Sequence, residues 1–169
     1  MKKVNRGKDF EKQIQKCFEN VPNISIDRLH DQMNGYAGSS NICDFIVYYY
    51  PIQLYIECKA TYGNTLPFSR ITETQYNGLL EKEKIKGVAS GYIIWYIDCD
   101  KTYFVPAYIA KEFKDRGCKS INQKDLVNNY NAIKLEGIKK RVFYNYDMTV
   151  FLNDVKNLKK AYNKGGVIK

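Results

Sequence analysis

Histidine is almost absent from this chain of 169 residues, in which His30 is the only one. Zinc hydrolases, Cys2His2 zinc fingers and nucleases with a histidine-metal centre use several histidines as metal ligands or catalytic bases, so the sequence excludes these classes. A Ser-His-Asp triad would have to use His30, and the chain lacks the Gly-x-Ser-x-Gly motif of many such hydrolases. We expect His30 to be a solvated residue at the end of a strand.

Nucleotide-binding, redox and membrane motifs are missing as well. The chain has no Walker loop, which excludes the P-loop NTPases. Its five cysteines are widely spaced and show no metal-site or redox-motif spacing, so we expect free thiols in a reducing, cytoplasmic compartment. No segment reaches the length of a membrane span, and the N-terminal residues MKKVNRGKDF lack the apolar run of a signal peptide, so we expect no membrane association.

Basic residues are abundant and concentrated near both ends of the chain. Lys and Arg number 27 against 18 Asp and Glu, which gives a net charge of +9. Residues 1–20 hold six basic and three acidic residues, and residues 134–169 hold nine and three. This distribution predicts a polyanionic partner, of which nucleic acid is the commonest. The alternative is a basic protein whose lysines serve only solubility.

Residues 44–59, DFIVYYYPIQLYIECK, predict a β-hairpin with charged residues on one face. An even-numbered turn centred between Tyr50 and Pro51 would place Asp44 opposite Glu57, with their Cβ atoms about 4.5–5.5 Å apart. Lys59 is two residues further along and shares that face. An odd-numbered turn would send Asp44 to the other face, so the prediction depends on the length of the turn. The apolar residues that alternate with the polar ones support the even turn: Ile52, Leu54, Ile56 and Cys58.

Two carboxylates and a lysine on one face indicate a specific chemistry. Two ionised carboxylates about 4 Å apart repel by about 4 kcal/mol at an effective dielectric constant near 20, unless one is protonated or a cation lies between them. Oxygen ligands suit Mg²⁺ or Mn²⁺. The Lys59 ammonium could polarise a water molecule or stabilise charge on a phosphate. The hairpin therefore predicts a metal-assisted phosphodiester hydrolase; the alternative is a surface strand pair with a Glu–Lys ion pair.

The hydrophobic pattern predicts a single α/β domain over residues 1–169, with a mixed β-sheet flanked by helices and a frayed tail at 164–169. Thr72 and Gln75 have the spacing of a capping box, so Gln75 has a structural interpretation of its own. Irregular segments are expected at 31–42 and 61–71. The expected helices are 6–20, 72–86, 107–116, 122–129 and 149–163; besides the hairpin, the expected strands are 24–29, 88–97, 102–106 and 141–146.

An acid followed by Glu-x-Lys on the next strand, after an amphipathic helix, resembles the PD-(D/E)xK nuclease superfamily, although Cys43 stands where that superfamily usually has proline. More specifically, the chain resembles the RecU family of Holliday-junction resolvases over roughly residues 5 to 125. The resemblance implies a restriction-endonuclease-like fold and a homodimer that resolves four-way DNA junctions with paired nicks and depends on Mg²⁺ or Mn²⁺. The segments that carry it are NRGKDFE (5–11), GYAGSSNICDF (35–45), ECKA (57–60), LPFSRITETQ (66–75) and GYIIWYIDCDKTYFVP (91–106).

The resemblance also implies roles for individual residues. Asp44 and Glu57 would be metal ligands together with the backbone carbonyl of Cys58, and Lys59 would be the catalytic lysine. Glu11 matches an acid on the first helix of the family, which favours a role at the metal site; from its position beside the apolar stripe alone it could equally face solvent. Gln75 matches a polar residue near the site.

The expected DNA contacts are Arg6 and Lys8, with Tyr36, Ser39 and Ser40 in the 31–42 loop. This loop replaces the long stalk that precedes the catalytic acid in the bacterial family, and Tyr36 would lie at its tip. Two other functions stay open. The chain could be a restriction or repair nuclease of the same superfamily, or a relative that binds DNA or a recombination protein without cleaving DNA.

Overall fold

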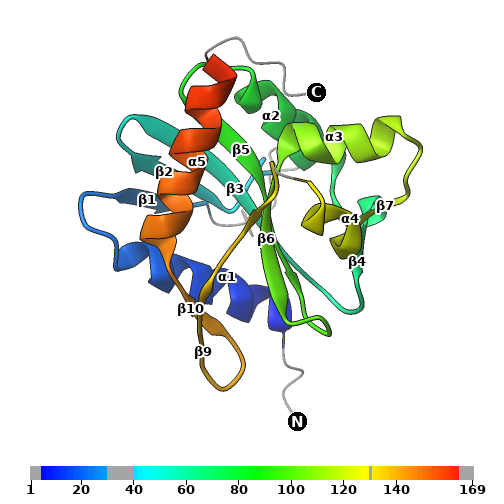
Figure 1. Ribbon diagram of the computed structural model, residues 1–169, viewed down its shortest axis with the longest axis horizontal. Coiled ribbons are helices and arrows are strands. Elements are labelled where there is room, and N and C mark those ends of the chain that lie inside the picture. Colours follow the sequence, from blue (N-terminus) through cyan, green and yellow to red (C-terminus); the bar gives the residue numbers. More distant parts are fainter. Residues whose placement is uncertain (1–4, 30–39, 130, 164–169) are drawn as a thin grey trace.

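The computed structural model describes residues 5–29, 40–129 and 131–163, with side chains described up to Ala161. A six-stranded mixed sheet runs through its centre (Figure 1) in the order β1-β2-β3-β5-β6-β8. Among the strand pairs of this sheet that the structure describes, only β3–β5 is parallel. The strands of this sheet are β1 Ser25–Arg28, β2 Phe45–Tyr49, β3 Ile52–Thr61, β5 Val88–Tyr96, β6 Lys101–Pro106 and β8 Ile133–Lys134.

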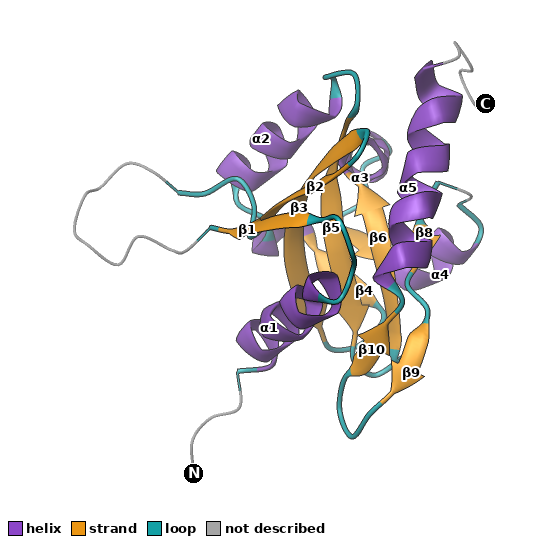
Figure 2. Cartoon of the chain, turned by 90° about the vertical axis from the view of Figure 1, so that its left-hand side faces the viewer, coloured by secondary structure: helices purple, strands orange, loops and turns teal. Residues whose placement is uncertain are grey.

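Helices cover both faces of the sheet (Figure 2). On one face, α1 (Arg6–Glu19) and α5 (Met148–Asn163) bury their apolar residues against alternate side chains of β2 and β3. On the other face, α2 (Glu73–Glu83), α3 (Ala107–Asp115) and α4 (Gln123–Val127) enclose a second core. All nine residues of β5 are buried, because this strand lies in the middle of the sheet with a core on each side.

The hairpin register agrees with the pairing expected from the sequence. Phe45 lies opposite Ile56 and Tyr49 lies opposite Ile52, so Tyr50 and Pro51 form a two-residue turn. The turn is even-numbered, and the predicted alternation is confirmed: Leu54 and Ile56 are fully buried in the core beneath α1 and α5.

The segment at 61–71 is more regular than predicted. It contains the short strand β4 (Thr65–Pro67) and the 3-10 helix η1 (Phe68–Arg70). β4 pairs with β7 (Ser120–Asn122), more than fifty residues later in the chain. This pairing is non-local, and the sequence around 61–71 carries no periodicity that reveals it.

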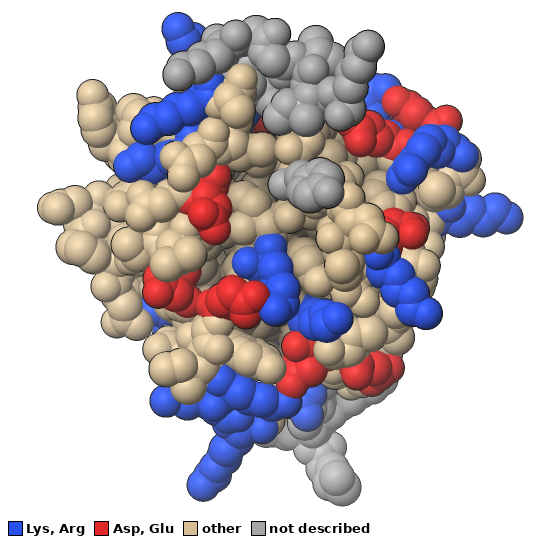
Figure 3. Space-filling model, viewed as in Figure 1, with Lys and Arg blue, Asp and Glu red and all other residues tan. Residues whose placement is uncertain are grey.

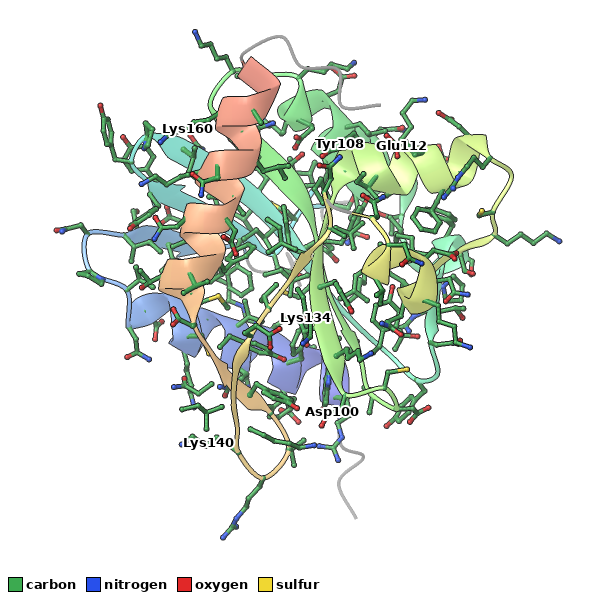
Figure 4. All side chains as sticks on the ribbon, in the orientation of Figure 1. Asp100, Tyr108, Glu112, Lys134, Lys140 and Lys160 are labelled. Atoms are coloured by element: carbon green, nitrogen blue, oxygen red, sulfur yellow. The ribbon has the colours of Figure 1, made fainter. Side chains whose placement is uncertain are left out.

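A second hairpin, β9 (Gly137–Lys139) and β10 (Tyr144–Tyr146), lies outside the main sheet. Asp100, labelled in Figure 4 at the β5–β6 turn, accepts a hydrogen bond from the Tyr144 hydroxyl at 3.2 Å and pairs with Lys139. Figure 3 shows basic side chains gathered at the lower end of this view, where Figure 1 places the hairpin.

The predicted fold class, a mixed α/β sheet flanked by helices, is confirmed. The predicted helices and strands agree with the observed ones to within a few residues, except that β4, β7, β8 and β9 were not expected. In the described part of the chain, no helix is both long and apolar enough to span a membrane. His30, most of the 31–42 loop and the 164–169 tail lie outside the described residues.

Candidate active site

Asp44 lies where the β2 ladder ends. Its backbone N–H donates to the Ile56 carbonyl at 3.0 Å, which is one residue out of the β2–β3 register, in which Asp44 would lie opposite Glu57. One step further along β3, the Cys58 N–H donates to Oδ2 of Asp44 at 2.7 Å. The carboxylate thus takes the position of a backbone acceptor, and this contact holds it beside β3.

Glu57 and Lys59 lie next to each other on the same face of β3. The Lys59 Nζ is 2.8 Å from Oε1 of Glu57. The Glu57 side chain is only 5% exposed and that of Lys59 is 15% exposed. An ion pair this shielded from water is held by its neighbours, and the neighbour that contacts both members is Gln75 on α2.

The Gln75 side-chain amide connects β3 to the start of α2. Its Nε2 donates to Oε1 of Glu57 at 2.7 Å, and its Oε1 accepts from Nζ of Lys59 at 3.3 Å. The same Oε1 accepts from the backbone N–H of Thr72 at 3.1 Å, while the Thr72 side chain accepts from the Gln75 N–H. Gln75 therefore completes the predicted capping box and also contacts both members of the Glu57–Lys59 pair, while its catalytic role stays a prediction.

Glu11 lies on α1 and forms an ion pair with Arg28 of β1, with Oε2 of Glu11 2.9 Å from the guanidinium. Its charge acts on both site carboxyls and raises their pKa values. Across residues 5–29, 40–129 and 131–163, no three His, Cys, Asp or Glu side chains gather closely enough to form a metal site. The metal-ligand role of Glu11 stays a prediction.

Burial shifts the protonation of the carboxyl pair strongly. Desolvation, followed by the charge of Asp44, raises the pKa of Glu57 to about 8. Desolvation also raises the pKa of Asp44 to about 6, and the Cys58 N–H opposes this rise. Two buried carboxyls that both resist ionisation form a site where a bound cation would be strongly stabilised.

The available donor atoms are hard oxygens, which fit Mg²⁺ or Mn²⁺. Along a strand, the N–H and C=O of one residue point to the same side. Because the Cys58 N–H points to Asp44, its carbonyl oxygen points to that side too, while the Cys58 thiol is buried in the core. Asp44, Glu57 and the Cys58 carbonyl thus offer three oxygen donors of suitable chemistry.

The predicted DNA contacts are only partly described. Arg6 is the first residue of α1, and Lys8, two residues later, is exposed. Ser40 is exposed four residues before Asp44. Tyr36 and Ser39 lie outside the described residues, so their roles stay predictions.

Two residues near the site were not anticipated from the sequence. Arg28 holds the Glu11 carboxylate through their ion pair. The sequence predicted only that Arg28 would lie in the strand expected at 24–29. Tyr92 is the β5 neighbour of Glu57 in the sheet. Its hydroxyl is buried and has no hydrogen-bond partner among the described residues. Both contacts depend on which helices and strands become neighbours in the fold, which local sequence does not reveal.

A comparison with protein-family models matches residues 5–150 to RecU, described as Recombination protein U. The chain belongs to the RecU family. Membership of this family assigns the chain to the nucleases that resolve Holliday junctions, and it agrees with the carboxylate–lysine cluster on β3.

Other similarities to known proteins are distant. Among solved structures, the chain is similar to Hjc, a Holliday junction resolvase from Archaeoglobus fulgidus, with a TM-score of 0.40 and 16% sequence identity. The match covers 60% of this chain and 74% of the Hjc chain. A likeness this distant transfers no property of that enzyme. No curated protein sequence matches the chain significantly.

Proposed function

We propose that this RecU-family chain is a Mg²⁺- or Mn²⁺-dependent endodeoxyribonuclease that resolves four-way DNA junctions by paired nicks. The observation that carries the proposal is the joined cluster of Asp44, Glu57 and Lys59 on neighbouring strands, with Gln75 bonded to both members of the Glu57–Lys59 pair. A module that only binds DNA has no need for two buried carboxyls whose pKa values are both raised.

The oxygen donors of Asp44, Glu57, the Cys58 carbonyl and Glu11 would hold the cation. A divalent ion held there supplies positive charge that lowers the pKa of the attacking water and offsets charge on the phosphate. The raised carboxyl pKa values mean that a cation and protons compete for this site.

The chain's own residues position the reaction. Lys59 keeps its ammonium beside Glu57 and presents it to a phosphate oxygen on which negative charge develops. Gln75 holds the ammonium and the carboxylate in fixed orientation through its two hydrogen bonds. Water attacks phosphorus, the bond to the 3′ oxygen breaks, and that oxygen takes a proton, which leaves a 5′ phosphate and a 3′ hydroxyl.

The proposed substrate is branched DNA, bound by a homodimer. A four-way junction has a twofold axis, so two copies of this site related by a twofold axis would cut two strands symmetrically. Arg6, Lys8, Tyr36, Ser39 and Ser40 are the proposed contacts to the DNA. Recombination proteins are further possible partners because junctions arise during strand exchange.

The decisive experiment compares wild type with Glu57→Gln on a synthetic mobile junction in Mg²⁺. We expect Glu57→Gln to nick at least roughly 1000-fold more slowly while still binding the junction, because removing a metal carboxylate forfeits several kcal/mol of charge stabilisation. Glu81→Gln is the matched control, since Glu81 is an exposed carboxylate on α2. Equal nicking by wild type and Glu57→Gln would overturn the assignment.

The same assay separates junction resolution from the alternatives. Flap and linear duplex substrates are cleaved in parallel with the junction. Preference for linear duplex at a fixed sequence would favour a restriction-type nuclease. Binding of the junction without cleavage in either Mg²⁺ or Mn²⁺ would favour a non-catalytic relative.

A further inference from the structure

A cavity of about 590 Å³ lies at the end of β3, beyond the catalytic lysine. The first residues of α1 form one wall, and Ala60, Tyr62 and Arg70 contribute to the others. Figure 1 shows the start of α1 beside the turn that joins β5 to β6. Ile97, the first residue after β5, also lines the cavity. We refer to this cavity as the arginine pocket, because Arg6 and Arg70 both line it.

The charged side chains among the described residues that line the arginine pocket are of one sign. They are two arginines, and no carboxylate is among them. The N-terminal end of α1, a helix of 14 residues, also faces it through Arg6 and Gly7. A helix N-terminus adds partial positive charge and backbone N–H donors to the two guanidinium groups. This combination favours an anion, and a phosphate suits arginine because the guanidinium can donate two parallel hydrogen bonds to it.

The Arg70 side chain is exposed but tethered to β3 by a hydrogen bond. Its guanidinium donates to the Ala60 carbonyl at 2.9 Å, which uses one of its five N–H groups and holds the group at the pocket wall. Binding an anion would therefore cost less side-chain entropy than it would for an untethered surface arginine.

The pocket lies at a fixed, short distance from the catalytic cluster. Ala60 directly follows Lys59, and it is three residues from Glu57 along β3, a separation of about 10 Å. That length corresponds to the rise of roughly three base pairs. On the other wall, Gly7 lies one helical turn before Glu11 on the same side of α1. A DNA strand whose scissile phosphate lies at Glu57 can therefore place a later phosphate in the pocket.

An aromatic side chain borders the same pocket. Tyr62 is 66% exposed, three residues after Lys59. Nucleases and single-strand-binding proteins use such exposed rings as stacking platforms for bases, at a gain that does not depend on sequence. A phosphate between the arginines would bring the adjoining base within reach of this ring.

We propose that the arginine pocket binds one internucleotide phosphate of the cleaved strand, two to four nucleotides from the scissile phosphate, and that the base beside it stacks on Tyr62. The inference rests on the proposed nuclease function and adds a binding subsite to it. The pocket sets which phosphodiester bond reaches Glu57 and Lys59, so Arg70 and Tyr62 are positioning residues.

The test replaces single phosphates of the cleaved strand with neutral methylphosphonates, one position at a time. For wild type, we expect one position two to four nucleotides from the cut to weaken junction binding roughly tenfold, the value of a charge-assisted contact. Arg70→Ala should bind the unmodified junction roughly tenfold more weakly and be insensitive at that one position. Its binding should also depend less on salt, with the slope of log K against log salt smaller by about 0.9.

Arg116→Ala, which removes an exposed guanidinium on α3, is the matched control and should keep the wild-type sensitivity at every position. Loss of sensitivity at a single phosphate cannot come from general misfolding. Equal sensitivity of wild type and Arg70→Ala at every phosphate would overturn the inference. If wild type binds junctions but does not cut them, the nuclease proposal fails while the binding assay still decides on the pocket.

Tyr62 is tested by binding junctions that carry one abasic position beside the sensitive phosphate. Tyr62→Ala should weaken binding of the intact junction about tenfold and leave binding of the abasic junction unchanged, because the stacking partner is already missing. Tyr62→Phe should restore the intact-junction affinity. Equal effects of Tyr62→Ala on both junctions would contradict the stacking role.

Discussion

At the scale of single residues, the Gln75 side chain belongs to both the helix cap and the carboxylate–lysine cluster. Its amide oxygen accepts from Thr72 and from Lys59, while its amide nitrogen donates to Glu57. A residue with two sets of partners couples helix stability to the geometry of the site. The two contributions can be separated because Thr72 takes part only in the cap.

We predict that Thr72→Ala lowers the free energy of unfolding by about 1 kcal/mol, the usual cost of losing an N-cap, and leaves junction cleavage unchanged. Gln75→Ala should show a similar loss of stability and also slow cleavage by roughly 10- to 100-fold, because Lys59 and Glu57 lose their shared contact. Urea denaturation and single-turnover nicking measure the two effects. Equal cleavage by both variants would rule out a role for Gln75 beyond the cap.

The carboxyl pair gives the metal-free protein a defined pH dependence. The pKa values of Asp44 and Glu57 are raised to about 6 and about 8, above their values of about 4 in the unfolded chain. Between pH 4 and pH 8 the folded state therefore binds more protons than the unfolded state. Its free energy of unfolding must fall as the pH rises through this window.

We therefore expect the Tm in EDTA to be lower at pH 8 than at pH 5, and Mg²⁺ to raise it more at pH 8, where fewer protons compete for the site. Glu57→Gln should flatten the upper part of the profile, since the side chain no longer titrates. Differential scanning calorimetry measures all three. A Tm in EDTA that rises steadily from pH 5 to pH 8, and equally in Glu57→Gln, would contradict this account.

The site illustrates what sequence can predict at this scale. The register of β2 with β3, and the shared face of Glu57 and Lys59, follow from alternation and an even turn, both of which are local. Asp44 is one residue out of that register, because its N–H bonds to the Ile56 carbonyl, and the sequence did not predict this. The ion pair between Glu11 and Arg28 could not be predicted, because it depends on how α1 packs beside β1. The place of Tyr92 beside Glu57 depends on the parallel pairing of β3 with β5. In the sequence, β4, η1 and α2 lie between these two strands.

At the scale of elements, α2 packs closely against the segment that leads into Asp44. A Cβ atom built on Gly78 would lie 2.4 Å from Cγ2 and 2.8 Å from Cβ of Ile42. Ile42 is β-branched and stiff, so it cannot move aside easily. The glycine lets α2 approach the chain two residues before Asp44.

We predict that Gly78→Ala displaces Ile42, lowers the free energy of unfolding by about 1–3 kcal/mol despite the better helix propensity of alanine, and slows cleavage through Asp44. Asn77→Ala is the control, because Asn77 is exposed at the neighbouring position of α2. Thermal denaturation and nicking assays on both variants test the prediction. A Gly78→Ala protein that is more stable than wild type and fully active would refute it.

Elements with local signals were predicted well, and elements made by distant pairing were not. The spacing of Phe10, Ile14 and Phe18 predicts α1, and the nine apolar or small residues of β5 predict a central strand. β4 and β7 are three residues each and exist because they pair with each other. Strands this short lack enough alternation to be recognised alone.

At the scale of the whole molecule, one buried ion pair ties the helices of the two faces together. The Lys159 Nζ on α5 is 2.6 Å from Oε1 of Glu83 on α2. Both side chains are less than 10% exposed. The Glu83 carboxylate also accepts from the backbone N–H and the hydroxyl of Ser90, at the start of β5. The contact joins the two helical layers at one end of the sheet.

We predict that Lys159→Ala lowers the free energy of unfolding by about 3 kcal/mol, because it leaves the buried Glu83 carboxylate without its cation. Lys160→Ala should change it by less than about 0.5 kcal/mol, since Lys160 is exposed. Urea denaturation at constant pH compares the two variants. A similar small change in both would show that the pair contributes little.

Some basic residues that lie far apart in the sequence come to the same end of the fold. The start of α1 and the β9–β10 hairpin, which contains Lys139, lie at the same end of the molecule in Figures 1 and 2. Lys160 on α5 lies at the opposite end (Figure 4), so only the hairpin part of the second basic segment lies near the start of α1, which composition alone did not predict. That arrangement follows from the packing of α1 against β10 through contacts such as that of Gln13 with the Tyr144 carbonyl.

The bond between the Cys58 N–H and Asp44 has a consequence for how variants of this site are interpreted. Alanine at position 44 removes the negative charge and also leaves a backbone donor of β3 without its acceptor. An inactive Asp44→Ala protein would therefore mix a chemical defect with a local defect in the sheet. Asparagine keeps an acceptor oxygen for that donor, so Asp44→Asn isolates the contribution of the charge.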